Sequence, residues 1–170
     1  MEARRYAIEG LKLSAAGLIA ILAYESFIPE ATIPVKGDPP TIGFGSTVKE
    51  DGTPVKLGEK IDPVSAVKRV NIHLQKDEVG LKKCVTAPLS QTEYDVLADF
   101  AYNYGLPTAC KSSMVRYINQ GNYEASCNAY TLYKYAGGYD CSTMINGERN
   151  KRCWGVWERS LERKAKCLAN

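Results

Sequence analysis

The sequence predicts an α+β fold in which a small β-hairpin lobe and a larger helical lobe are joined by a long helix. Three observations support this prediction. An apolar stretch with helical character covers residues 3–25, a segment rich in proline and glycine covers residues 31–50, and helical patterns with capping signals follow from residue 62. One short extended region among many helices is typical of a sheet set to one side of a helical domain. We expect residues 1–170 to form one domain, because this length suits a single core.

The joining helix is expected to begin at Asp62-Pro63, since aspartate is a favoured N-cap and proline fits the first helical turn. Apolar residues continue at near-helical spacing as far as Val79. Its place between the extended segment and the later helices suggests that it bridges the two lobes. His73 lies within it, and because no second histidine or nearby cysteine accompanies it, we expect a structural role.

The second half of the chain predicts four more helices. Ser90-Gln-Thr-Glu93 forms a capping box, so a helix begins there and ends at the Gly105-Leu-Pro107 sequence. The other three are expected from Ser112 or Ser113 to Gly121, over residues 122–135 and over residues 156–168.

Six cysteines are many for a chain of this length: Cys84, Cys110, Cys127, Cys141, Cys153 and Cys167. The single histidine and the absence of a Cys-x-x-Cys motif argue against zinc, and we expect no metal and no cofactor. Three disulfides, and therefore an oxidising compartment, are favoured over six buried thiols. About 15 pairings are possible and the sequence does not choose among them. Our hypothesis follows the order of the elements: Cys84–Cys110, Cys127–Cys167 and Cys141–Cys153.

Glu25 is the first candidate for chemistry. The apolar run from Leu13 to Tyr24 leads directly into it, and desolvation there would raise the pKa of its carboxyl and keep a proton available. Asp38 stands in a turn before the short strand that begins at Thr41. Two carboxyls on facing elements are the arrangement that glycoside hydrolysis uses. A solvated helix end and an ordinary turn aspartate remain the alternative interpretation.

Several segments carry a resemblance to a known family. They are Ser14–Glu25, Thr41–Thr47, Phe100–Gly105, Ser112–Tyr123, and a weaker stretch from Ala136-Gly-Gly138 to Gly155–Arg159. In this order they resemble the phage-type lysozyme family, the muramidase endolysins of bacteriophages. The resemblance implies a cleft between the two lobes. It also implies cleavage of the β-1,4 bond between N-acetylmuramic acid and N-acetylglucosamine of peptidoglycan, with inversion, leading to lysis of the host cell.

The resemblance also implies roles for particular residues. Glu25 matches the general acid, and Thr41 matches a residue that helps to hold the attacking water. The family pattern is Glu, eight residues, Asp, five residues, Thr, but Glu25 and Thr41 are one residue further apart here. Asp38 is the only aspartate between them and is our candidate for the water-orienting base, with Thr32 and Glu30 as alternatives. The predicted substrate-binding residues are Gly43, Asn103 and Ser113.

Two other functions stay open: a chitin-cleaving enzyme, and a glycan-binding domain without catalysis. We expect a monomer and no binding to nucleic acid, because the net charge of +3 is weak and no motif for it is present. Residues 1–24 combine a basic start with an apolar run of signal-peptide length. They act either as an export segment, with transient membrane association and a periplasmic or extracellular location, or simply as the helix that leads to Glu25. The second interpretation is the simpler one.

Overall fold

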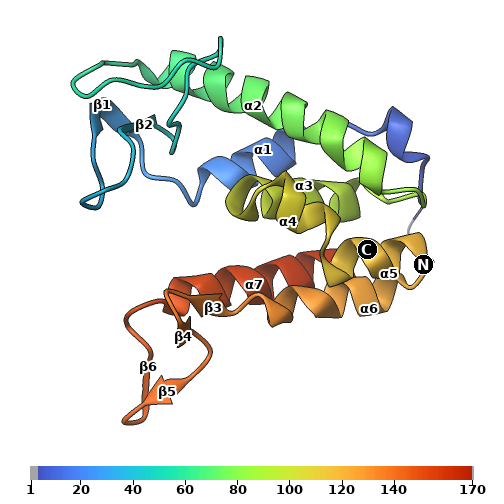
Figure 1. Cartoon of the computed structure of the whole chain (residues 1–170). Coiled ribbons are helices and arrows are strands. Elements are labelled where there is room, and N and C mark those ends of the chain that lie inside the picture. Colours follow the sequence, from blue (N-terminus) through green and yellow to red (C-terminus); the bar gives the residue numbers. More distant parts are fainter. Residues whose placement is uncertain (1–3, 170) are drawn as a thin grey trace.

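A computed structural model describes residues 4–169 and divides them into two lobes joined by helix α2 (Pro63–Cys84), as Figure 1 shows. The smaller lobe contains the strands β1 (Ile28–Thr32) and β2 (Thr41–Gly43) and the loop that follows them. The larger lobe is helical. This agrees with the α+β architecture predicted from the sequence.

The helix predicted over residues 3–25 forms only in its later part, and its extension before residue 15 is wrong. The segment contains a 3₁₀ turn, η1 (Ile8–Gly10), and a short helix, α1 (Ala15–Leu22). Tyr6 instead exchanges backbone hydrogen bonds with Leu89, which holds the chain extended before η1. Ser14 then caps α1 and donates its hydroxyl to the Asp95 carboxylate. Tertiary partners therefore override the helical pattern before residue 15, while residues 1–3 lie outside the described residues.

The hairpin lobe has a small core of its own. β1 and β2 pair antiparallel with an irregular register, Ile28 opposite Gly43 and Thr32 opposite Thr41. The strand thus starts at residue 28, earlier than the hairpin expected over residues 31–50. The buried apolar side chains of this lobe are Ala31, Ile42 and Val55.

Helix α2 forms as predicted. The Asp62 carboxylate accepts a hydrogen bond of 3.0 Å from the backbone of Ser65, and Pro63 occupies the first turn. Val70 and Leu74 pack against Ile21 of α1, so α2 and α1 share a buried contact.

The helical lobe follows the predicted order, with corrections at its end. Its helices are α3 (Gln91–Tyr104), α4 (Leu106–Cys110), α5 (Ser113–Asn119), α6 (Tyr123–Ala129), the 3₁₀ turn η2 (Tyr130–Leu132) and α7 (Trp154–Leu168). The capping box between Ser90 and Glu93 is present. Phe100, fully buried, contacts the rings of Tyr104, Tyr130 and Tyr133 at the centre of the core.

The helix predicted over residues 122–135 stops early, because two hairpins follow η2. They are β3 (Tyr135–Ala136) with β4 (Tyr139–Asp140), and β5 (Met144–Ile145) with β6 (Glu148–Arg149). Each turns on a pair of residues with positive φ, Gly137-Gly138 and Asn146-Gly147. Such two-residue turns are the commonest hairpin connections, and Asn-Gly is their strongest sequence signal.

The three disulfides have the pairing that the order of the elements suggested. Cys84 is bonded to Cys110, Cys127 to Cys167, and Cys141 to Cys153. The first ties α2 to α4, the second ties α6 to α7, and the third closes the segment that contains the β5–β6 hairpin. All three lie outside the β1–β2 lobe.

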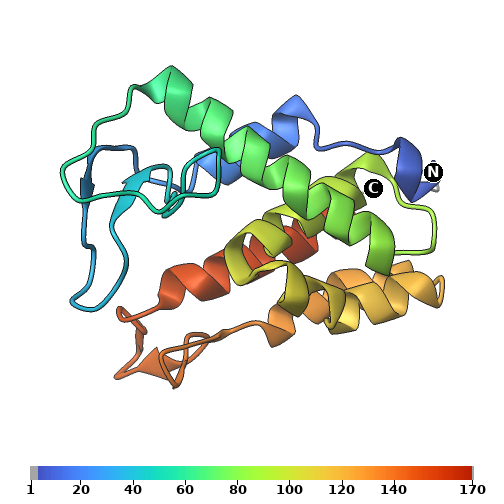
Figure 2. The ribbon, with the colours of Figure 1, turned by 45° about the horizontal axis from the view of Figure 1, so that its top comes forward.

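The strand-containing parts lie at the same end of the molecule. Figures 1 and 2 both show β1–β2 beside one end of α2, and β3–β6 beside the N-terminal end of α7, away from the chain termini. Within the described residues, none of the helices combines the length and the apolar character needed to cross a bilayer.

Candidate active site

Glu25 stands just after α1, where its backbone N–H donates a 3.1 Å hydrogen bond to the carbonyl of Leu22. The carboxyl is half-buried, and burial is the main reason that its pKa is raised above the ordinary value. The guanidinium of Arg159, whose Nη1 lies 3.9 Å from Glu25 Oε1, lowers this pKa, while the charge of Asp99 raises it. The net effect favours a carboxyl that holds its proton.

Glu25 lines a cavity of about 280 Å³ between the two lobes. The hairpin lobe contributes Gly45, Ser46, Thr47 and Val48, α2 contributes His73, and α3 contributes Tyr102 and Asn103. The cavity therefore lies where the resemblance to phage lysozymes predicts a cleft.

Gly45 allows the hairpin lobe to approach Glu25 closely. Its φ of +83° favours glycine, and a Cβ there would lie 3.6 Å from Glu25 Oε2 and 3.9 Å from the hydroxyl of Tyr102. That hydroxyl donates a 2.6 Å hydrogen bond to the carbonyl of Phe44. Burial raises the pKa of Tyr102 to about 12, so the bond persists at neutral pH. Tyr102 thus attaches the hairpin lobe to α3 beside Glu25.

Asn103 is one of the residues that line the cavity. Its amide nitrogen donates hydrogen bonds to the backbone and the carboxylate of Asp99, and its oxygen accepts one of 2.8 Å from Arg159. Asp99 is in turn bonded to the buried Arg163 at 2.6 Å. A network of charged and polar groups from α3 and α7 therefore fixes the side of the cavity next to Glu25.

Three predicted residues of the hairpin lobe do not line this cavity. Asp38 is exposed in the turn between β1 and β2, where its N–H donates to the carbonyl of Val35. The hydroxyl of Thr41 donates a 3.2 Å hydrogen bond to the carbonyl of Pro39. Gly43 is buried with φ +66°, and a Cβ there would come within 3.0 Å of Ala66 on α2. Glycine is needed at this position because a larger residue would clash with α2.

The other predicted residues are also separate from Glu25. Ser113 opens α5, a helix that packs on α6 and α4. Glu30 is exposed on β1 and pairs with Lys60 at 3.6 Å, and Thr32 is exposed on the same strand. None of the three lines the cavity that holds Glu25.

Four cavity residues were not assigned to the site from the sequence: Ser46, Thr47, Val48 and His73. Thr47 belongs to the strand segment that carries the resemblance, but its position beside Glu25 depends on the turn at Gly45. His73 was expected to be structural, yet its ring lies in the cavity wall, with Nε2 3.5 Å from the carbonyl of Lys49. The sequence held one clue that His73 lies at the cavity, namely the predicted position of α2 between the lobes. A helix that joins two lobes presents one side to the space between them.

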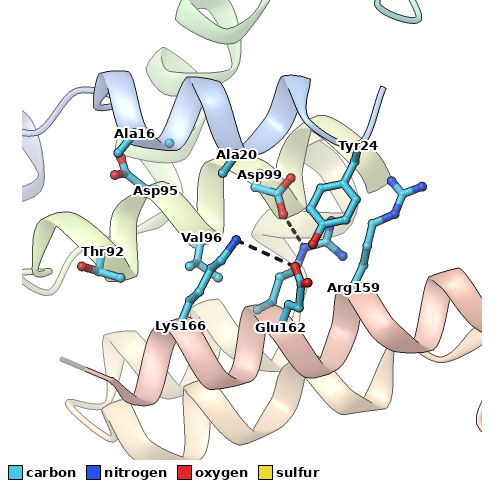
Figure 3. Close-up of a pocket in the computed structure, with 12 residues that line it drawn as sticks. Ala16, Ala20, Tyr24, Thr92, Asp95, Val96, Asp99, Arg159, Glu162 and Lys166 are labelled. Atoms are coloured by element: carbon cyan, nitrogen blue, oxygen red, sulfur yellow. Dashed lines mark hydrogen bonds and ion pairs between the residues drawn. The ribbon is translucent and has the colours of Figure 1, made fainter. Parts of the chain in front are cut away.

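A second cavity, of about 220 Å³, is lined by residues of α1, α3 and α7. Figure 3 shows it between α1, α3 and α7, with Ala16 and Ala20 on one side and Lys166 and Glu162, paired at 3.8 Å, on the other. Arg159 stands at its edge with the guanidinium 5.2 Å from the ring centre of Tyr24. Among the described residues no group of histidine, cysteine and acidic side chains is arranged to hold a metal ion.

Comparisons with known proteins agree with this geometry. The family model described as phage lysozyme matches residues 23–152. The endolysin of Salmonella phage P22 is 36% identical over 113 residues, which cover 66% of this chain and 77% of that protein. The endolysin of Bacillus phage B103 is 26% identical over 84% of this chain, which spans only 53% of that relative's length.

Solved structures show the same fold. A P22 lysozyme mutant has a TM-score of 0.75 at 27% identity, over 93% of this chain and 99% of its own. The endolysin of Escherichia coli O157:H7 phage FAHEc1 has a TM-score of 0.77 at 27% identity, over 94% of both chains. The family match covers well over half of the chain and includes Glu25 and all the residues of the cavity between the lobes. The chain belongs to the phage lysozyme family.

Proposed function

We propose that this protein is an endolysin that hydrolyses the β-1,4 bond between N-acetylmuramic acid and N-acetylglucosamine in peptidoglycan. The observation that carries the proposal is Glu25, a half-buried carboxyl with a raised pKa in a cavity between two lobes. The membership of this chain in the phage lysozyme family and the endolysin names of its relatives agree with this activity.

Glu25 acts as the general acid in this proposal. A sugar alkoxide is a poor leaving group, so the glycosidic oxygen has to receive a proton as the bond breaks. Burial keeps that proton on Glu25 at a pH at which an exposed glutamate has lost it. Asn103 and Arg159, bonded to each other beside Glu25, offer an amide and a cation to the sugar hydroxyls.

The residue that activates the water remains a prediction. We assign this role to Asp38 with Thr41, and the assignment requires the β1–β2 turn to close over Glu25, since Asp38 is exposed at the tip of that turn. Inversion needs about 6.5–9.5 Å between the two carboxyl groups. Glu30 and Thr32 on β1 are the alternatives.

The place of action in this proposal is the cell wall, outside the cytoplasm, where three disulfides are stable. We propose a monomer. Residues 1–24, which include α1, are either the means of export and of transient membrane contact or simply the segment that leads to Glu25. Ser113 and Gly43 remain proposed sugar contacts, to be tested by substitution.

A zymogram on purified peptidoglycan beside one on chitin tests the proposal. The wild type should clear peptidoglycan and leave chitin intact. Glu25→Gln should lower turnover roughly a hundredfold or more, because the amide cannot donate a carboxylic proton. Glu162→Gln, the same change at an exposed position of α7, is the matched control. Clearing of chitin alone would identify the chitin-cleaving alternative, and binding without clearing would identify the non-catalytic one.

The proposed role of Asp38 and Thr41 in activating the water is tested in the same assay. Asp38→Ala should cripple hydrolysis and Thr41→Ala should weaken it less. Asp51→Ala, at another exposed turn of the same lobe, controls for general effects on the loop. Full activity of Asp38→Ala would reassign the role to Glu30 or Thr32.

A further inference from the structure

Another cavity adjoins the one that holds Glu25, on the side of β3, and the two share Asn103. This neighbouring cavity of about 260 Å³ lies between α3, β3 and α7, and Asn103 and the adjacent Arg159 stand at the junction. Its walls include the rings of Tyr104 and Tyr135 and the side chain of Val156. A chain of sugar rings that passes Glu25 and Asn103 therefore meets a second concave surface.

The inner wall of this cavity is held rigidly. The ring of Tyr104 stacks on that of Phe100 with 4.6 Å between the ring centres. Arg163, only 4% exposed, is fixed by its 2.6 Å bond to Asp99. Its Nη2 atom is buried and has no hydrogen-bond partner among the described residues. The same guanidinium lies 5.7 Å from the ring centre of Tyr104 and 5.8 Å from that of Phe100, so it packs into the wall behind the cavity.

The outer wall of the cavity carries one strongly exposed tyrosine, Tyr135 on β3, which is 60% exposed. Tyr139 on β4 is 48% exposed and pairs with Ala136, so it points to the other face of the hairpin. Cations lie against their rings, with Lys134 Nζ 5.4 Å from the ring centre of Tyr135 and the guanidinium of Arg152 4.6 Å from that of Tyr139. Exposed aromatic rings on a fixed support are a common feature of binding surfaces.

The β3–β4 hairpin is anchored at its end. The disulfide between Cys141 and Cys153 follows directly after β4. Lys134 is paired with Asp140 at 2.7 Å, and Asp140 also accepts hydrogen bonds from the backbone and hydroxyl of Ser142. Little conformational entropy is then lost when a ligand binds the rings.

We propose that this cavity and the exposed face of β3–β4 form a further subsite, which binds sugar rings of the glycan strand beyond those at Glu25. The inference rests on the proposed function, because it takes peptidoglycan as the ligand. A pyranose ring combines an apolar face, which fits against Tyr135, with hydroxyls at its edge, which fit Asn103 and Arg159. The surface offers both kinds of group side by side.

Binding is measured in the Glu25→Gln background, so that hydrolysis does not consume the ligand. The probes are insoluble peptidoglycan and glycan strands from which the peptides have been removed, each in a pelleting assay. Tyr135→Ala should weaken binding to both probes by about fivefold or more, as expected for loss of an aromatic anchor. Tyr6→Ala removes a tyrosine of similar exposure, 46%, on the distant N-terminal segment and should bind like the parent.

Melting temperatures of the variants establish that each is folded. Equal binding by the Tyr135 and Tyr6 variants would overturn the subsite. A loss seen on intact peptidoglycan and absent on peptide-free strands would also overturn it, because the tyrosine would then contact peptide. Hydrolysis by the wild type is scored separately, so that failure of the proposed function and failure of the subsite give different results.

Discussion

The hairpin lobe and the helical lobe are stabilised in different ways. The hairpin lobe buries only the small apolar cluster of Ala31, Ile42 and Val55, and it contains none of the cysteines. The helical lobe has an extensive apolar core around Phe100 and all three disulfides. Local stability follows the amount of buried apolar contact, so the two lobes should open independently and at different free energies.

This difference has a functional meaning. The groups that adjust and orient Glu25, namely Arg159, Asn103 and Asp99, all belong to the rigid lobe. Asp38, the proposed base, belongs to the other lobe. In the proposed mechanism the acid is therefore positioned by the lobe with the large core, and the base is carried by the lobe with the small one.

The largest expected loss of stability comes from shortening a buried side chain in each of the two cores. Leu97→Ala in α3 removes a fully buried side chain from the large core and should destabilise the protein by about 2–5 kcal/mol. Ile42→Ala should cost less, because the small cluster can collapse around the gap. Thermal unfolding of both variants measures the difference. A loss of stability for Ile42→Ala equal to that for Leu97→Ala would contradict the comparison.

Much of this organisation could be predicted from the sequence, since capping signals and apolar periodicity act locally. The capping box at Ser90 and the Asp62-Pro63 start both form as expected. The helix expected over residues 3–25 fails before residue 15 because its competitors are distant: Tyr6 pairs with Leu89, and Ser14 bonds to Asp95. Partners so far away in the chain leave no local trace in the sequence.

The candidate site shows the same limit. Glu25 and Asn103 could be found from the resemblance, because each sits in a segment that matches the family. His73 and Thr47 could not be assigned to the cavity, since their positions depend on how α2 and the hairpin lobe meet. The hairpins of residues 135–149 did have a local signal, Asn146-Gly147. It was not used, because the sequence predicts a helix over residues 122–135 and the glycine pair after it as the end of that helix.

A smaller effect separates the three disulfides. Paired Cys→Ala changes at Cys127–Cys167 should destabilise the most and those at Cys141–Cys153 the least, because the bridges span 40 and 12 residues. The cost of loop closure predicts a difference of about 1 kcal/mol between them. Denaturant unfolding of each variant gives the ranking. The intact mass of the untreated protein should also lie six hydrogens below the reduced value.

Reduction also tests which lobe the bridges stabilise. Amide exchange in the helical lobe should accelerate when all three disulfides are reduced, whereas that of Ala31 and Ile42 should change little while the protein stays folded. Faster exchange confined to the hairpin lobe would reverse the comparison.

The smallest expected effect is a shift in pH dependence where the two lobes meet. Glu25 has to be protonated to act as an acid, so activity should fall as pH rises through its pKa. Burial raises that pKa and Asp99 raises it further, while Arg159 lowers it. Arg159→Gln removes the lowering influence, which should move the alkaline limb of the pH–rate profile to higher pH, even if the maximal rate also falls.

The position of the limb is the decisive measurement, because loss of the hydrogen bond from Arg159 to Asn103 can lower the rate without moving it. Arg116→Gln, a change at an exposed arginine of α5, is the matched control and should leave the limb in place. His73 and Tyr102 also face Glu25 and remain unchanged in both variants. An alkaline limb that stays fixed, or moves to lower pH, in Arg159→Gln would mean that the rigid lobe does not set the protonation of Glu25.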